Sequence, residues 1–93
     1  MAPPLAPIRD KKYLAHVRTF GCLICDGAAE AHHSNVSRTR GMGIKSGDDT
    51  CVPLCHRHHM ELHDYGNERL WWALKGVDPD EWARNSYMSY TAG

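Results

Sequence analysis

Residues Cys51–His63 read CVPLCHRHHMELH and hold two cysteines and four of the chain's seven histidines in thirteen positions. An ordinary hydrophobic core has no use for this density of sulfur and imidazole, whereas zinc and similar divalent metals select these donors. Cys55-x-x-His58 has the spacing of half a tetrahedral zinc site. His59-x-x-x-His63 is an i, i+4 pair, which a helix places on one face. The segment therefore predicts two metal sites, each needing ligands from elsewhere in the chain.

The first site finds its partners in Cys22-x-x-Cys25, a second half-site in a stretch that reads as a tight turn closed by Asp26-Gly27. Four ligands complete a closed structural zinc site. In a cytosolic protein, which we expect here, cysteines are more often metal ligands than disulfide partners. Cys51 leaves a four-cysteine site open as an alternative. Because Cys51 lies in an apolar run, where a free cysteine is typically a small buried hydrophobe, we favour His58. The zinc ligands predicted are Cys22, Cys25, Cys55 and His58.

The second site draws on two histidine pairs, His32-His33 and His59 with His63. Adjacent residues of a strand point to opposite faces, so only one of the first pair readily joins the second pair at a metal. The other is then free to act as a base near neutral pH. Three protein ligands leave coordination positions open, as in catalytic metal sites. These histidines could instead be surface residues or support the zinc, but two clusters beside a zinc knuckle favour a second metal site.

Helix and strand signals divide the rest of the chain. We expect a helix after the N-cap Asp10, short strands in AAEAHH and TCVPL, a long loop over residues 34–49, and a helix from Cys55–His56 to about Tyr65. Two more helices follow, NERLWWALK and one starting at Asp78-Pro79. The apolar residues expected to pack these last helices on the metal core are Leu70, Trp71, Leu74 and Trp82. Base stacking by the tryptophans is the weaker alternative.

Length and charge limit the number of domains and the kinds of partner that the chain can have. With 93 residues there is room for one domain, which we place at residues 10–93 behind a flexible proline-rich arm at residues 1–9. No apolar run is long enough to span a membrane and no secretory signal opens the chain, so we expect a cytoplasmic protein. Net charge is zero, but residues 1–58 carry eight Lys/Arg against five Asp/Glu and residues 59–93 carry three against six. This asymmetry permits a basic face toward an anionic partner.

The order of these motifs resembles the HNH endonucleases, whose core is the ββα-metal fold. The stretches GMGIKSGDD, CVPLCHRHH and GNERLWWALKGVDPDEWA are similar to those of small phage and prophage HNH-type proteins related to the recombination-enhancement nuclease Ref. The similarity spans about residues 12–84. It implies an α+β fold with a small zinc-stabilised ββα-metal core and flanking helices, a DNA endonuclease activity, and a place in the bacterial host cell.

The resemblance also assigns roles to the candidate site residues. It implies that Cys22, Cys25, Cys55 and His58 hold a structural zinc, that His33 is the general base, and that His32, His59 and His63 bind a catalytic Mg²⁺, Mn²⁺ or Zn²⁺. The middle Asn of the HNH motif is missing. Thr50 stands at about its position, and the residues that could replace it are Thr50, Asp48, Asp49 and Asn35.

DNA is the partner implied, with a recombination protein as a further one. Four basic residues are candidates for phosphate contacts, namely Arg38, Arg40 and Lys45 on the long loop and Arg57 at a helix start. Loop arginines are as often only solvated. The alternative to a nuclease is a catalytically inactive zinc-binding module that holds DNA or a recombination protein, and a purely structural zinc-stabilised interaction domain is a third.

Overall fold

The computed structural model describes residues 8–34 and 47–92. These residues form a compact α+β structure with a two-stranded antiparallel sheet and four α-helices. In chain order the elements are α1 (Lys11–Arg18), β1 (Glu30–His33), the short 3₁₀ helix η1 (Asp48–Thr50), β2 (Cys51–Leu54), α2 (His56–Tyr65), α3 (Glu68–Lys75) and α4 (Pro79–Ala92).

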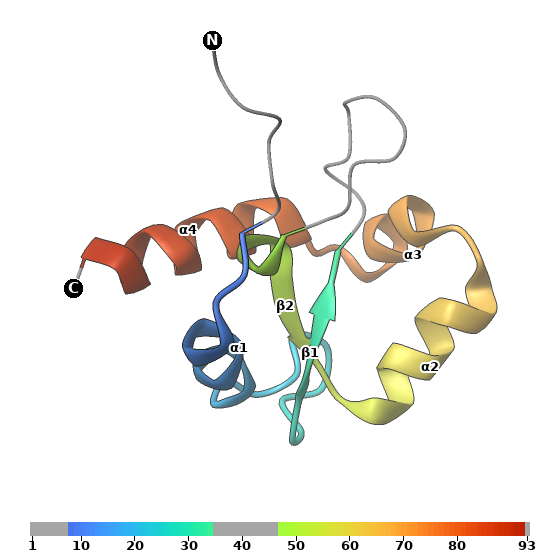
Figure 1. Cartoon of the computed structure of the whole chain (residues 1–93). Helices are drawn as coiled ribbons and strands as arrows, with labels where there is room; N and C mark the ends of the chain where they lie inside the picture. The colour runs from blue at the N-terminus through green and yellow to red at the C-terminus, as the bar shows by residue number, and fades with distance from the viewer. Residues whose placement is uncertain (1–7, 35–46, 93) are drawn as a thin grey trace, which may run out of the picture.

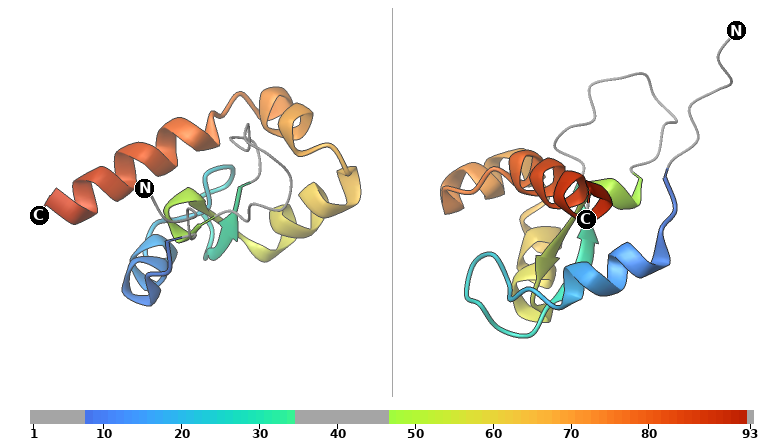
Figure 2. Two further views of the ribbon diagram at one scale, coloured as in Figure 1. Left: turned by 45° about the horizontal axis from the view of Figure 1, so that its top comes forward. Right: turned by 90° about the vertical axis from the view of Figure 1, so that its left-hand side faces the viewer.

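The elements surround the β1–β2 hairpin. Figures 1 and 2 show α1 and α2 on opposite sides of the two strands, with α4 running past one end. α1 packs on both strands, α2 packs on both strands and on α3, and α4 contacts η1 and β2. The predicted strands and helix starts are thus found where the local signals placed them.

Helix ends follow the predicted capping residues. The Asp10 carboxylate accepts the amide of Tyr13 at 3.0 Å, and the Asn67 side chain accepts the amide of Leu70 at 3.1 Å. Each bond satisfies a backbone donor that has no partner within its helix. α2 and α3 end at Gly66 and Gly76, whose φ angles of 86° and 73° lie in the left-handed region that glycine adopts without steric cost.

The pairing register determines which side chains lie on each face of the sheet. His32 pairs with Val52, and His33 pairs with Cys51. Because side chains alternate along a strand, His32, Val52 and Leu54 share one face. Val52 and Leu54 pack with residues of α2 and α3, whereas Cys51 packs with Tyr13 and Val17 of α1. The hairpin therefore sends the two adjacent histidines to opposite sides.

The expected packing of α3 is right for its tryptophan and wrong for its leucines. Trp71 is 1% exposed, and its neighbour Trp72 is equally buried, whereas Leu70 and Leu74 are 45% and 66% exposed. The two adjacent tryptophan rings occupy the buried face of α3, so Leu70 and Leu74 lie on its exposed face. Trp82 is partly buried and packs against both core clusters, as expected.

None of the helices formed by the described residues has the length and apolar character that a bilayer crossing requires.

A matched pair of leucines tests this core assignment. Leu62 of α2 is 4% exposed and belongs to the cluster around Trp71 and Trp72, while Leu74 is largely exposed. We expect Leu62→Ala to cost about 2–5 kcal/mol of unfolding free energy. Leu74→Ala should change it by less than about 0.5 kcal/mol. Urea unfolding monitored by tryptophan fluorescence measures both, and equal losses would contradict this packing.

Candidate metal centres

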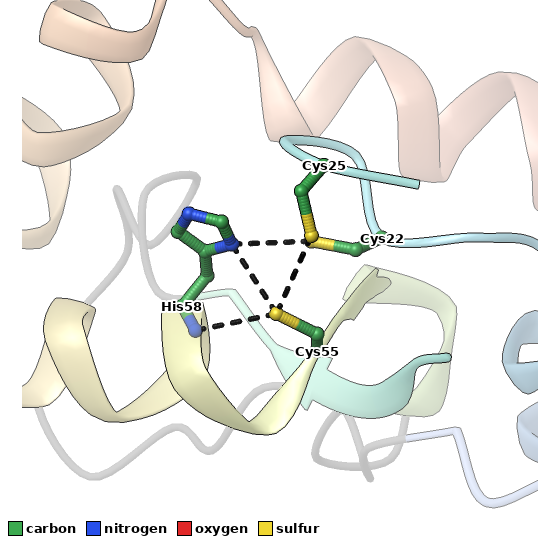
Figure 3. A group of neighbouring side chains, drawn as sticks. All are labelled: Cys22, Cys25, Cys55 and His58. Carbon is green, nitrogen blue, oxygen red and sulfur yellow. Dashed lines mark hydrogen bonds between the residues drawn. The ribbon is translucent and has the colours of Figure 1, made fainter. Parts of the chain in front are cut away.

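The first candidate centre lies between the turn that follows α1 and the start of α2. It consists of the four residues predicted for the structural zinc, Cys22, Cys25, Cys55 and His58, whose donor atoms all lie within 4.8 Å of one another. Figure 3 shows the two turn cysteines facing Cys55 and the imidazole of His58, which rises from the first turn of α2. The structure thus gathers two half-sites separated by 29 residues in the chain.

Backbone hydrogen bonds shape the turn that carries Cys22 and Cys25. The amide of Cys22 donates to the carbonyl of Gly27 at 2.8 Å, and the amide of Asp26 donates to the carbonyl of Cys22 at 2.8 Å. Asp26 has a φ of 65°, which aspartate tolerates better than most residues. A Cβ at Gly21 would collide with the side chain and carbonyl of Asp26. Glycine is therefore required at position 21, directly before the turn.

The spacing of the donors fits one tetrahedral ion. Cys25 Sγ lies 3.6 Å from Cys55 Sγ, and Cys22 Sγ lies 3.7 Å from Nδ1 of His58. Cys55 Sγ is 3.2 Å from the same nitrogen. Sulfur and nitrogen ligands at about 2.0–2.3 Å from a tetrahedral zinc lie roughly 3.5–3.8 Å apart. The four side chains need only small adjustments to hold zinc.

The ionisation of the thiols separates Cys22 from Cys51. Burial raises the pKa of Cys22, but hydrogen bonds from the amides of Cys55, Ile24 and Cys25 outweigh it and lower the pKa to about 6. A ligand thiolate is therefore favoured at neutral pH. Burial instead raises the pKa of Cys51 to about 12, which keeps it a thiol. Cys51 also groups with residues outside this cluster, so His58, and not Cys51, is the fourth member of the cluster.

The second candidate centre joins β1 to α2. His32, His59 and His63 bring their ring nitrogens within 4.8 Å of one another. Nδ1 of His32 is 3.1 Å from Nε2 of His59, and the rings of His59 and His63 lie 5.0 Å apart between centroids. The i, i+4 spacing on α2 and the inward face of β1 produce this convergence.

Two carboxylates fix which nitrogens face each other. Nε2 of His32 lies 2.8 Å from Oε2 of Glu68, and Nδ1 of His59 lies 2.8 Å from Oε1 of Glu30. A carboxylate only accepts, so each of these nitrogens carries the proton. In neutral imidazoles the two facing nitrogens, 3.1 Å apart, are then both acceptors. Their lone pairs repel each other unless a cation lies between them, so this donor set fits a metal ion well.

One side of the histidine centre is open. A pocket of about 340 Å³ is lined by His32, His63 and Glu68 together with Leu62 and Gly66. His32 is buried and His63 is exposed, so the centre passes from the protein interior to the surface. A metal on three ligands beside such a pocket keeps positions for water or a substrate oxygen.

His33 leaves the hairpin on the other face, as the strand alternation predicts. Its Nε2 lies 2.8 Å from Oδ1 of Asp48. The donor atoms of His33, Asp48 and Cys51 all lie within 4.8 Å of one another. The other oxygen of Asp48 accepts the amide of Asp10, and Arg9 lies 3.6 Å from the carboxylate. Burial raises the pKa of Asp48, but the bonds from His33 and from the Asp10 amide outweigh it and keep it low. Asp48 is therefore an ionised acceptor beneath His33.

The predicted phosphate contacts are only partly described. Arg57 is exposed in the first turn of α2, while Arg38, Arg40 and Lys45 lie outside the described residues, as does Asn35. His56 is largely exposed and its Nδ1 lies 2.9 Å from Glu30.

Sequence reasoning missed two residues of the histidine centre. Glu30 stands two positions before His32 and so shares its face of β1, and this alternation was the signal that could have found it. Glu68 reaches His32 only because α3 folds back on α2, and no local sequence pattern predicts that contact.

Comparison with known proteins places the chain in a family. A curated relative, the uncharacterized protein YdfU of Escherichia coli (strain K12), is 39% identical over 54 residues, which are 57% of this chain and 16% of the relative. The chain therefore matches only a small part of that longer protein. No solved structure matches the chain significantly. A family model described as "Protein of unknown function (DUF968)" matches residues 1–93 in full, and the chain belongs to this family.

Proposed function

We propose that this protein is a metal-dependent DNA endonuclease of the HNH type, built on a ββα-metal core and used in phage or prophage DNA processing. The carrying observation is the histidine centre, in which His32, His59 and His63 converge with two acceptor nitrogens facing each other. A hairpin followed by a helix supplies these histidines, and the same helix begins at the cysteine cluster. The order of motifs and the open pocket support a hydrolytic site rather than a closed structural one.

The histidines of the centre would hold the catalytic ion from the protein side. A divalent ion bound there supplies Lewis acidity, which stabilises charge on a phosphate oxygen and on the leaving alkoxide. Glu30 and Glu68 keep the rings of His59 and His32 turned toward the centre and fix their tautomers. Arg57, exposed at the start of α2, would contact a DNA phosphate. Arg38, Arg40 and Lys45 remain candidates for the same role.

His33 is the proposed general base. Its Nε2–H donates to Asp48, so Nδ1 is left as the acceptor for a proton from the attacking water. Asp48 would also stabilise the imidazolium that forms after this transfer. The same carboxylate accepts the amide of Asp10, so its position is fixed from two sides. Asp48 thereby takes over the orienting task of the missing Asn.

The proposal is tested by nicking of supercoiled plasmid DNA. Purified protein with its zinc bound should convert supercoiled plasmid to open circles when Mg²⁺, Mn²⁺ or Zn²⁺ is added, and EDTA should stop the reaction. DNA binding without nicking under all three metals would favour the inactive zinc-binding module instead. That alternative would hold DNA or a recombination protein through the same basic residues.

The role of Asp48 predicts a separate kinetic effect. Asp48→Ala should lower the single-turnover nicking rate by about 10²-fold, because a base that loses its orienting partner spends little time in a reactive geometry. DNA affinity should stay unchanged, and Asp48→Asn, which keeps an acceptor oxygen, should recover part of the rate. Asp49→Ala is the matched control one position away and should nick at the normal rate. Equal rates for Asp48→Ala and Asp49→Ala would rule out this positioning role.

A further inference from the structure

Two adjacent tryptophans of α3 each donate a hydrogen bond to a carboxylate. Trp71 and Trp72 are both 1% exposed, and buried indole N–H groups need an acceptor. Trp72 donates to Oε2 of Glu68 at 3.0 Å, and Trp71 donates to Oε2 of Glu61 at 3.3 Å. The two rings lie 5.0 Å apart at nearly a right angle, so their N–H groups serve different acceptors.

Each of these carboxylates lies behind a histidine of a different metal centre. Oε2 of Glu68 is 2.8 Å from Nε2 of His32 in the histidine centre. Oε1 of Glu61 is 4.0 Å from Nε2 of His58 in the cysteine centre, too far for a hydrogen bond. Glu61 is also 43% exposed and paired with Lys75, whereas Glu68 is 16% exposed. Only the contact to the histidine centre is both short and shielded.

We infer that Glu68, fixed by Trp72, is a positioning residue that sets the metal affinity of the histidine centre. Its carboxylate holds the proton of His32 on Nε2 and so keeps the Nδ1 lone pair aimed at His59. An anionic acceptor behind a ligand imidazole also makes that imidazole a stronger donor to the metal. The inference rests on the metal-binding part of the proposed function and not on DNA cleavage.

The position of Glu68 explains how α3 takes part in the centre. Glu68 is the first residue of α3, directly after the N-cap Asn67, and the turn at Gly66 brings it next to the end of α2. Glu68 and Trp72 are one helical turn apart, so the carboxylate and the indole meet on the same face. The hairpin and α2 supply the three imidazoles, and α3 supplies the group that orients one of them.

The inference is tested by metal titration of the full chain with its zinc bound. Mn²⁺ binding followed by calorimetry in the absence of DNA should weaken by about 10–100-fold in Glu68→Gln. Trp72→Phe keeps an aromatic ring in the core but removes the N–H together with part of the indole, and we expect a weaker loss of about 3–10-fold there, because the carboxylate stays but is less well fixed. Glu61→Gln, which loses the equivalent tryptophan-bound carboxylate on the other side, should bind Mn²⁺ like the unmodified protein. Zinc content should remain unchanged in all three variants.

The outcomes separate this inference from the nuclease proposal. Mn²⁺ affinity within about twofold of normal in both Glu68→Gln and Trp72→Phe would overturn the role of Glu68, even if plasmid nicking persists. A selective loss in those two variants would support it, even if the protein proves unable to cut DNA. Absence of any Mn²⁺ binding by the unmodified protein would overturn it as well.

Discussion

Cys22→Ser should release the zinc ion and abolish cooperative folding of the domain. Cys22 is one of the four clustered residues that could hold the ion, and it is also 4% exposed within the main core cluster, so a metal bound there would be connected to the packing of Trp71 and Leu62. Structural zinc contributes roughly 10–16 kcal/mol of apparent binding free energy in small zinc domains, as much as or more than the whole stability of a typical domain. A chain this small has little core to compensate. Elemental analysis and a thermal melt by circular dichroism measure both effects.

Cys51→Ala is the matched control. Cys51 is just as buried as Cys22, but it belongs to the α1 side of the hairpin and its high pKa keeps it a thiol. This variant should keep one equivalent of zinc and a cooperative melt, with a loss of about 1 kcal/mol from the smaller side chain. A Cys22→Ser protein that melts like the original would contradict the structural zinc, and loss of zinc in Cys51→Ala would point to a four-cysteine site.

His59→Ala and His33→Ala should both abolish detectable nicking, for different reasons. His59 contacts the other two histidines and Glu30. Its removal should therefore eliminate metal binding at the histidine centre. His33 lies on the opposite face of the hairpin, and its removal should leave metal affinity intact. Loss of a general base lowers rates by about 10²–10⁴-fold, and loss of the Lewis acid removes several kcal/mol of transition-state stabilisation.

The two variants are distinguished by measuring nicking and Mn²⁺ binding on the same samples. His16→Gln, a histidine of α1 outside both centres, serves as the control and should nick at the original rate. Nicking that survives in both His33→Ala and His59→Ala, after purification to homogeneity, would contradict the assignment of the nuclease site to these two histidines. Loss of metal in His33→Ala would mean that His33 is a ligand and not the base.

Local sequence signals predicted most of the architecture. Asp10, Asn67, Gly66 and Gly76 delimit helices because each satisfies or ends a backbone hydrogen-bonding pattern on its own. The clustering of the candidate ligands was also predictable, since the two-residue and i, i+4 spacings constrain geometry within one element. Side-chain alternation along the strand Glu30–His33 is likewise a local property, and it is sufficient to separate the two adjacent histidines.

Tertiary contacts account for what the sequence could not predict. Leu70 and Leu74 have helical spacing like core residues, yet the adjacent tryptophans take the buried face and leave both leucines exposed. Glu68 and Asp48 acquire their roles from contacts with residues 36 and 15 positions away. Four candidates for the Asn that the HNH resemblance leads one to expect were equivalent in the sequence, and the contact with His33 favours Asp48 among the described residues. The choice between Cys51 and His58 likewise depended on which side of the hairpin each one packs.

The most direct test of two metal centres on one short helix is anomalous scattering from crystals grown with zinc and soaked in Mn²⁺. Data on either side of the zinc edge should place zinc among Cys22, Cys25, Cys55 and His58. A manganese peak should lie among Nδ1 of His32 and the nearest ring nitrogens of His59 and His63. Zinc alone, with no manganese near His59, would contradict the second centre, and manganese between His33 and Asp48 would contradict the assignment of His33 as a base.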